Sequence, residues 1–122
     1  MKKLLSITIA ALAFSGFVHA DSQWTTVAKA AGKTWDVKKG SGLETRTADG
    51  HYWEWVTVRI TEDSTQETMM TIQGTSWDEC KKGRGQIHIT DGKNIETSNF
   101  AMDKRNTTVA SAIAYNICFV KN

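Results

Sequence analysis

The first twenty residues limit which part of this chain folds, and where. The chain begins with a short basic segment, Met1-Lys2-Lys3, and continues with an apolar stretch over residues 4–18 that contains no acidic residue. A basic start, an apolar middle and a small residue at the end are typical of a secretory signal peptide. We expect cleavage after Ala20, so that residues 1–20 are a signal peptide and residues 21–122 form a single exported domain. This domain is expected in the periplasm or at the surface of a Gram-negative-type bacterium.

The charge balance of the exported domain argues against nucleic acid as a partner. Without Lys2 and Lys3, 13 of the 15 Lys and Arg residues remain, and they balance the 13 Asp and Glu residues. Nucleic-acid binding depends on a surplus of positive charge. No second long apolar run follows, which predicts no integral membrane segment after cleavage. Position 21 is Asp and not the Cys of a lipid anchor, so we expect a soluble form, with an uncleaved N-terminal anchor as the alternative.

The two cysteines, Cys80 and Cys118, are expected to form a disulfide. An even number of cysteines in an exported chain usually indicates a disulfide, and one pair has only one connectivity. Closing a loop of this length stabilises a fold by roughly 4 kcal/mol in the chain-entropy model. A redox or nucleophilic thiol is the alternative, but the chain contains no C-x-x-C motif to support it.

The segment from His51 to Thr61 has the clearest strand pattern. Its even positions carry mainly Tyr, Val and Ile, whereas its odd positions carry two Trp, a His and an Arg. Large apolar residues on both faces are typical of a central strand covered on both sides. A basic turn is expected at residues 81–85 and a hairpin turn at residues 91–94. Further strands are expected at Trp24–Ala28, Thr34–Val37, Glu67–Trp77, Gln86–Thr90 and Ile95–Ser98.

The end of the chain changes from strand to helix periodicity. Val109, Ile113 and Ile117 recur at helical spacing, and Asn106 or Thr107 is a possible N-cap. This apolar stripe needs a surface to cover, and a sheet face is the one available. The predicted fold class is therefore α+β: an antiparallel β-sheet of about five to seven strands, a C-terminal α-helix packed on it, and one disulfide.

Taken in order, these pieces resemble the bacterial surface-adhesin protein E family across the mature chain. The likeness implies a domain that binds host matrix and serum proteins at a cell surface and can dimerise. The chain departs from the family in its extra residue before Cys80, in lacking a proline segment before the last helix, and in lacking a lipid-attachment Cys. The matching pieces are Trp24-Thr25-Thr26-Val27, Gly32-Lys33-Thr34-Trp35-Asp36-Val37, Gly50-His51-Tyr52-Trp53-Glu54-Trp55-Val56, Trp77-Asp78-Glu79-Cys80-Lys81-Lys82 and the segment from Val109 to Cys118.

Trp53, Trp55 and His51 are the first candidate binding residues, because they share one face of the central strand. Exposed, they would form an aromatic strip for a protein or glycan partner, since Trp is enriched in binding hot spots. Covered by the helix, they would be core, and this is the arrangement that the sequence favours. The other tryptophans, Trp24, Trp35 and Trp77, are also expected in the core.

Lys81, Lys82 and Arg84 are the second candidate set. This basic turn could contact an acidic partner, although three charges in a turn are more often a solvated loop. No metal, cofactor or catalytic motif accompanies His51 or His88, and Glu54 is expected to pair with Arg59 or another basic residue. We therefore expect a non-enzymatic protein without a cofactor or metal.

The functional prediction is a binding protein that acts through protein–protein contacts and forms a possible homodimer. The partner would be a host matrix protein or an envelope protein. The alternative is a periplasmic inhibitor or immunity-type protein that inserts a loop into a hydrolase or toxin. Residues 81–85 or 40–46 would then supply that loop.

Overall fold

The computed structural model describes residues 23–102 and 108–120. The predicted signal peptide, residues 1–20, lies outside the described residues. So do Asn106 and Thr107, the two predicted helix caps.

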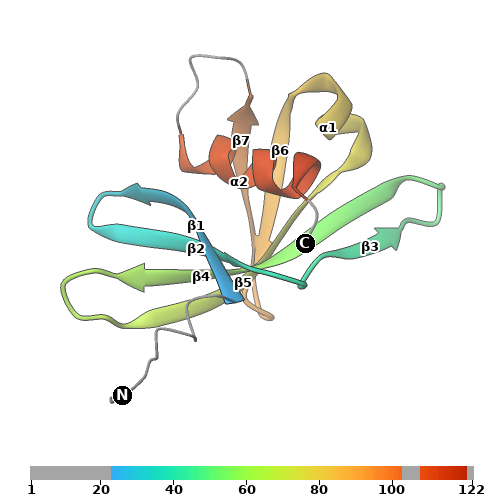
Figure 1. Ribbon diagram of the computed structural model, residues 1–122. Helices are drawn as coiled ribbons and strands as arrows, with labels where there is room; N and C mark the ends of the chain where they lie inside the picture. The colour runs from blue at the N-terminus through green and yellow to red at the C-terminus, as the bar shows by residue number, and fades with distance from the viewer. Residues whose placement is uncertain (1–22, 103–107, 121–122) are drawn as a thin grey trace.

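A single antiparallel sheet forms most of the described chain, and two helices lie on one side of it (Figure 1). The strand order is β1-β2-β4-β5-β6-β7, and β3 pairs with β4 beside this path. This architecture confirms the predicted fold class. The strands are β1 (Trp24–Ala30), β2 (Lys33–Lys38), β3 (Leu43–Arg46), β4 (Tyr52–Glu62), β5 (Thr68–Ser76), β6 (Arg84–Thr90) and β7 (Ile95–Ala101); the helices are α1 (Trp77–Lys82) and α2 (Val109–Phe119).

Strand β4 is the central strand of this sheet, as its pattern predicts. Its first half pairs with β3 and its second half with β2 along one edge, while β5 follows nearly its whole other edge. Successive side chains of a strand point to opposite faces. Val56 and Val58 therefore point to the helix side, where both are buried, and Trp53 and Trp55 point to the other side.

Helix α2 closes the core over one face of the sheet. Ile113 and Ile117 are almost fully buried, and Val109 packs at the border of the same cluster, as the predicted stripe requires. The helix begins after Thr108, whose hydroxyl accepts a hydrogen bond from the Ser111 N–H at 3.2 Å. Thr108, and neither of the two predicted residues, is thus the N-cap. The sheet residues of the core are Val37, Val56, Val58, Ile87 and Phe100.

Two elements differ from the sequence prediction. Lys81 and Lys82 do not lie in a turn, because they end helix α1, and Gly83 then terminates the helix in a left-handed conformation with φ of 77°. Arg84 already belongs to β6. The segment from Leu43 to Arg46, for which no strand is predicted, forms β3.

The Cys80–Cys118 disulfide is confirmed, and it joins the two helices. Cys80 lies in α1 and Cys118 near the end of α2, with their Cα atoms 5.5 Å apart, within the usual range. The bond fixes α1 beside α2, on the same side of the sheet (Figure 1). It therefore leaves the opposite face of the sheet free of helices in the described part of the chain.

Candidate functional site

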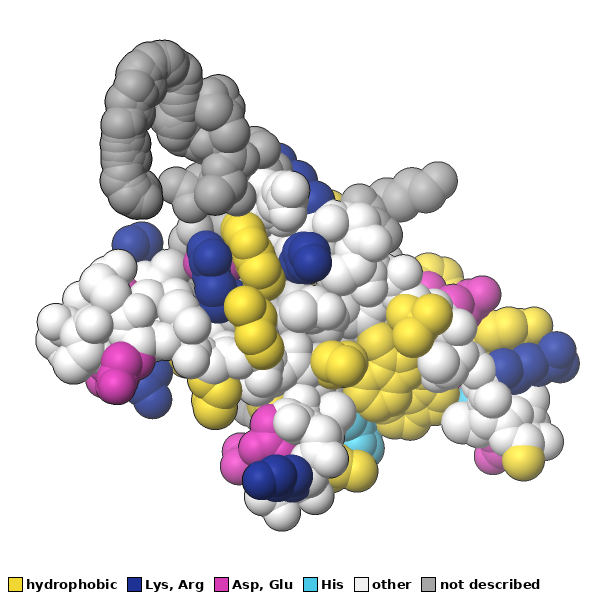
Figure 2. All heavy atoms as spheres, turned by 90° about the horizontal axis from the view of Figure 1, so that it is seen from below, with side chains coloured by type: hydrophobic (Ala, Val, Ile, Leu, Met, Phe, Trp, Pro, Cys, Tyr) yellow, Lys and Arg dark blue, Asp and Glu magenta, His cyan; other side chains and the backbone are white. Residues whose placement is uncertain are grey.

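An aromatic platform lies on the sheet face opposite α2. The Trp53 and Trp55 rings are stacked, with centroids 5.7 Å apart and planes inclined by 17°. The His88 ring meets Trp53 edge-on at 4.8 Å. Figure 2 shows this face with a broad hydrophobic patch near its middle and histidine side chains at the border of the patch. The expectation that the helix covers Trp53 and Trp55 is wrong, because α2 covers the other face.

Trp55 is held flat by its neighbours on both sides. Its indole N–H donates a hydrogen bond of 2.9 Å to the Thr45 hydroxyl on β3. On the other side it lies against Gly74 of β5, where a Cβ atom would come within 2.4 Å of the Trp55 ring. Only glycine leaves room for the ring at this position. The orientation of the platform is therefore set by two strands and does not depend on a partner.

Exposed aliphatic side chains border the platform. Cross-strand partners share a face of a sheet. Leu43 is paired with Trp55, Ile72 with Thr57 and Met70 with Arg59, so all three lie on the open face. Their exposed fractions are large for such side chains: 60% for Leu43, 52% for Met70 and 47% for Ile72. Ile95, the first residue of β7, is 73% exposed. We call Trp53, Trp55, His88, Leu43, Met70, Ile72 and Ile95 together the open-face patch.

The charged side chains next to the open-face patch, Arg59 and Asp36, neutralise each other. The guanidinium of Arg59 contacts the buried carboxylate of Asp36 at 2.9 Å and lies over the Trp24 ring at 4.3 Å from its centroid. The Thr26 hydroxyl donates a further hydrogen bond of 2.6 Å to the other carboxylate oxygen of Asp36. Arg59 therefore pairs with Asp36 and not with Glu54 as predicted, and Trp24 is only half-buried outside the core. The patch thus meets solvent as a largely uncharged surface.

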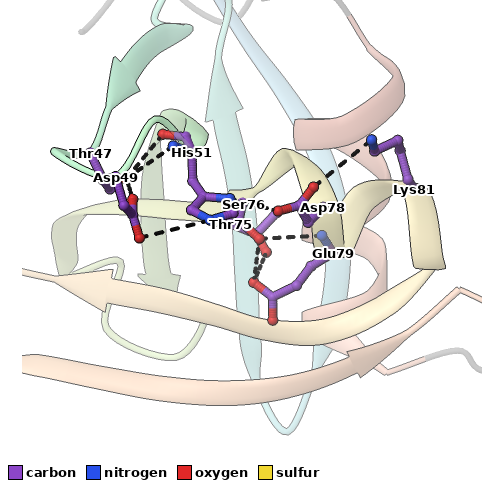
Figure 3. Close-up of polar contacts among 8 residues, drawn as sticks. All are labelled: Thr47, Asp49, His51, Thr75, Ser76, Asp78, Glu79 and Lys81. Atoms are coloured by element: carbon purple, nitrogen blue, oxygen red, sulfur yellow. Dashed lines mark hydrogen bonds and ion pairs between the residues drawn. The ribbon is translucent and has the colours of Figure 1, made fainter.

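His51 is separate from the aromatic stack, although it shares the strand parity of the two tryptophans. Its Nδ1 lies 2.8 Å from a carboxylate oxygen of Asp78 in α1, and its Nε2 lies 3.7 Å from Asp49 (Figure 3). A hydrogen bond from the Thr47 hydroxyl is the main cause that lowers the pKa of the Asp49 carboxyl. His51 therefore connects α1 to the β3–β4 turn.

The basic candidates lie away from the platform. Lys81 is exposed, and its Nζ lies 3.9 Å from a carboxylate oxygen of Asp78 within α1. Lys82 and Arg84 are exposed on either side of Gly83. Lys81 and Lys82 lie in α1, on the helix side of the sheet, whereas Arg84 is the first residue of β6 and shares the strand parity of His88, which places it on the open face. The three side chains therefore do not form one basic region.

Glu79 links α1 to the sheet, although sequence reasoning assigned it no role. One carboxylate oxygen accepts from the Ser76 hydroxyl at 2.9 Å, and the other accepts from the Gln86 N–H at 2.8 Å (Figure 3 shows the α1 side). Burial alone would raise the pKa of this carboxyl, but the hydrogen bonds from Gln86, Ser76 and Thr75 outweigh it and lower the pKa. The signal was present in Ser76-Trp77-Asp78-Glu79, which has the S-x-x-E spacing of a capping box.

A groove of about 510 Å³ on the helix side brings two carboxylates together. Glu54 of β4 lies opposite Glu44 of β3. Burial, and then the charge of Glu44, raise the pKa of the Glu54 carboxyl. Neither His51 nor His88 lines this groove.

Several members of the open-face patch escaped sequence reasoning. His88, Leu43 and Ile72 join Trp53 and Trp55 only through strand pairing, which a single sequence does not specify. In the described part of the chain, no group of three or more His, Cys, Asp or Glu side chains is arranged to hold a metal ion. No helix within that part is long and apolar enough to cross a membrane.

Comparison with protein-family models, with curated proteins and with solved structures finds no match for this chain.

Proposed function

We propose that this chain is an exported, non-enzymatic binding protein that holds a protein partner on the open-face patch. The observation that carries the proposal is the stacked Trp53–Trp55 pair on the sheet face that neither α1 nor α2 covers. Contiguous exposed apolar surface is uncommon on monomeric proteins and marks interaction sites. Trp is the residue type most enriched among those that dominate binding energy.

The border of the patch favours a protein over a glycan. A sugar ring stacks on an aromatic face, but it gains little from aliphatic side chains. Leu43, Met70 and Ile72 lie on the same sheet face as the aromatic rings and are about half exposed or more. Because Asp36 neutralises Arg59 beside them, a charged partner surface would lose its hydration without gaining an ion pair. The expected partner therefore presents an uncharged, apolar protein surface.

Export of the protein and its likeness to the surface-adhesin protein E family are expectations from the sequence. The Cys80–Cys118 disulfide supports export, since disulfides persist in oxidising compartments. The resemblance to the surface-adhesin protein E family suggests host matrix proteins as the first partners to screen, with an envelope protein as the second class. Self-association would use the same patch and is distinguished by the mass of the complex.

The inhibitor hypothesis has less structural support. Residues 81–85 are occupied by the end of α1, its Gly83 cap and the start of β6, and Leu43–Arg46 is paired with β4. Both segments that would supply an inserting loop are thus largely held in regular structure. No observation on the helix side favours this function over binding at the open face.

The test is binding of the exported protein to immobilised matrix proteins, with fibronectin, laminin and collagen as the panel. Trp53→Ala and Trp55→Ala should each weaken the interaction by more than about tenfold, as hot-spot truncations do. Tyr115→Ala is the matched control, because Tyr115 is an exposed aromatic residue on α2. Unchanged affinity of both Trp variants, or loss confined to a Lys81→Ala/Lys82→Ala/Arg84→Ala variant, would refute the open-face patch as the binding site.

A further inference from the structure

A second site lies on the opposite side of the sheet, beside the first turn of α2. It is a cavity of about 320 Å³ lined by residues of β2, β4, β5, β6, β7 and α2. Trp35, Ile60, Ile87, Ile89, Val109 and Ile113 supply its apolar wall. Small-molecule pockets typically measure about 300–1,000 Å³ and are mostly apolar with a few placed polar groups. By volume this cavity suits a small ligand.

The most deeply buried polar side chain of the cavity lining is the amide of Gln73, which is only 2% exposed. The Thr71 hydroxyl donates its proton to the Val58 carbonyl at 3.1 Å, so toward Gln73 it can only accept. The Gln73 Nε2 group accordingly donates to Thr71 at 3.1 Å. This pair of bonds fixes the orientation of the amide and leaves Oε1 without a donor from the described residues.

An unpaired buried acceptor is a costly feature. Leaving such a group unsatisfied costs about 1–3 kcal/mol, and most buried polar groups in folded proteins have a partner. Gln73 occupies an inward position of β5, where an aliphatic residue would complete the core next to Val56 and Ile89. The buried amide thus points to a hydrogen-bond donor that the described part of the chain does not supply.

The remaining polar lining sets the charge of the ligand. Asp91 and Glu96 contribute exposed carboxylates, and the described lining residues include no Lys, Arg or His. Hydrogen bonds from the backbone N–H groups of Asn94 and then Lys93 lower the pKa of Asp91, so its carboxylate is ionised at neutral pH. A ligand with a carboxylate or phosphate would be repelled, whereas a neutral or cationic one would not.

We propose that this cavity binds a small apolar molecule that carries an O–H or N–H donor and no negative charge. The donor bonds to Gln73 Oε1, and the apolar body packs between Trp35 and the first turn of α2. Alcohols and amines both supply such a donor, and a titration with each of them separates the two. The site is independent of the open-face patch, which lies on the other side of the sheet.

The test is an NMR titration of the 15N-labelled exported protein with 4-phenylbutan-1-ol, its methyl ether, 4-phenylbutylamine and 4-phenylbutanoate. The alcohol or the amine should shift the Gln73 side-chain amide and the backbone amides of Ile89 and Val109. The indole N–H signals of Trp53 and Trp55 should not move. The ether and the carboxylate should each bind at least about tenfold more weakly than the better donor probe.

Two variants separate ligand recognition from a structural role of Gln73. Gln73→Met keeps the size and apolar contacts but removes the acceptor, so the preference for alcohol over ether should disappear. Ala110→Phe fills the cavity and should abolish binding of all four probes. Trp55→Ala, on the far face, should bind them like the unaltered protein.

Three results would overturn the proposal. One is the absence of shifts at the cavity with millimolar alcohol and amine, which would leave solvent as the only partner of Gln73. Another is binding of the carboxylate as tightly as the alcohol or amine. The third is an alcohol preference that Gln73→Met retains while its thermal unfolding shows an intact fold.

Discussion

At the scale of single residues, Glu79 contributes to the stability of the fold in a way that depends on pH. Its lowered pKa means that the folded state holds the ionised form better than the unfolded chain does. The stabilisation is therefore present above the ordinary Glu value of 4.5 and is lost as pH falls through the lower, folded value. Glu79→Gln should lower the free energy of unfolding by about 2 kcal/mol at neutral pH, because charged hydrogen bonds are lost.

Urea titrations over a range of pH values check this prediction. The difference between Glu79→Gln and the unaltered protein should shrink steadily once the pH falls below 4.5. The matched control is Glu96→Gln, since Glu96 is exposed on β7. A difference that stays constant from neutral to acid pH would show that the Glu79 carboxylate is not the group responsible.

Asp36 is expected to stabilise the fold by neutralising Arg59. It is 5% exposed and accepts hydrogen bonds from Arg59 and Thr26. Asp36→Ala should cost about 2–3 kcal/mol of unfolding free energy, because it leaves the Arg59 charge half-buried and unpaired. Removing both charges in Asp36→Val/Arg59→Met should restore most of that loss. A double variant as unstable as Asp36→Ala would mean that the unpaired charge is not the cause.

At the scale of elements, the sequence predicts most of the sheet and misses two short elements, the strand β3 and the helix α1. The alternating pattern of β4 and the helical spacing of α2 are strong because each buries one continuous apolar face. The short strand β3 has no such face: all four of its residues are exposed, and only pairing with β4 makes it a strand. Helix α1 has only six residues, too few for an apolar periodicity, so its local signs are the spacing of Ser76 and Glu79 and the glycine that follows it, Gly83.

The Cys80–Cys118 disulfide is expected to stabilise α1 and the end of α2. Few apolar contacts hold α1, since Cys80 is its one buried residue. Cys80→Ser/Cys118→Ser should therefore lower the unfolding free energy by as much as about 4 kcal/mol in the chain-entropy model. Hydrogen exchange should rise first in α1 and in the last turn of α2. Reduction of the unaltered protein should reproduce both changes, and an unchanged melting temperature would contradict the structural role of the bond.

At the scale of the whole molecule, the two faces of the sheet differ in what covers them: α2 packs on one face, and the other exposes the open-face patch. The sequence could not show which face α2 covers, because large apolar residues occupy both parities of β4. The choice follows from strand register, which pairs Val37 with Val58 and places Ile87 and Phe100 in the same core cluster, on the face opposite Trp55. Register depends on long-range pairing, so the open-face patch becomes visible only in the folded molecule.

The decisive measurement is site-specific photo-crosslinking on intact cells that export the protein. A p-benzoylphenylalanine probe replaces Ile72 in the open-face patch, and a matched probe replaces Tyr115 on α2; both positions are exposed. The Ile72 probe should yield one discrete adduct with a different protein, and this adduct should disappear when Trp53→Ala is added. Adducts that form equally from Tyr115, that survive Trp53→Ala, or that contain only a second copy of this chain would contradict a partner-binding open face.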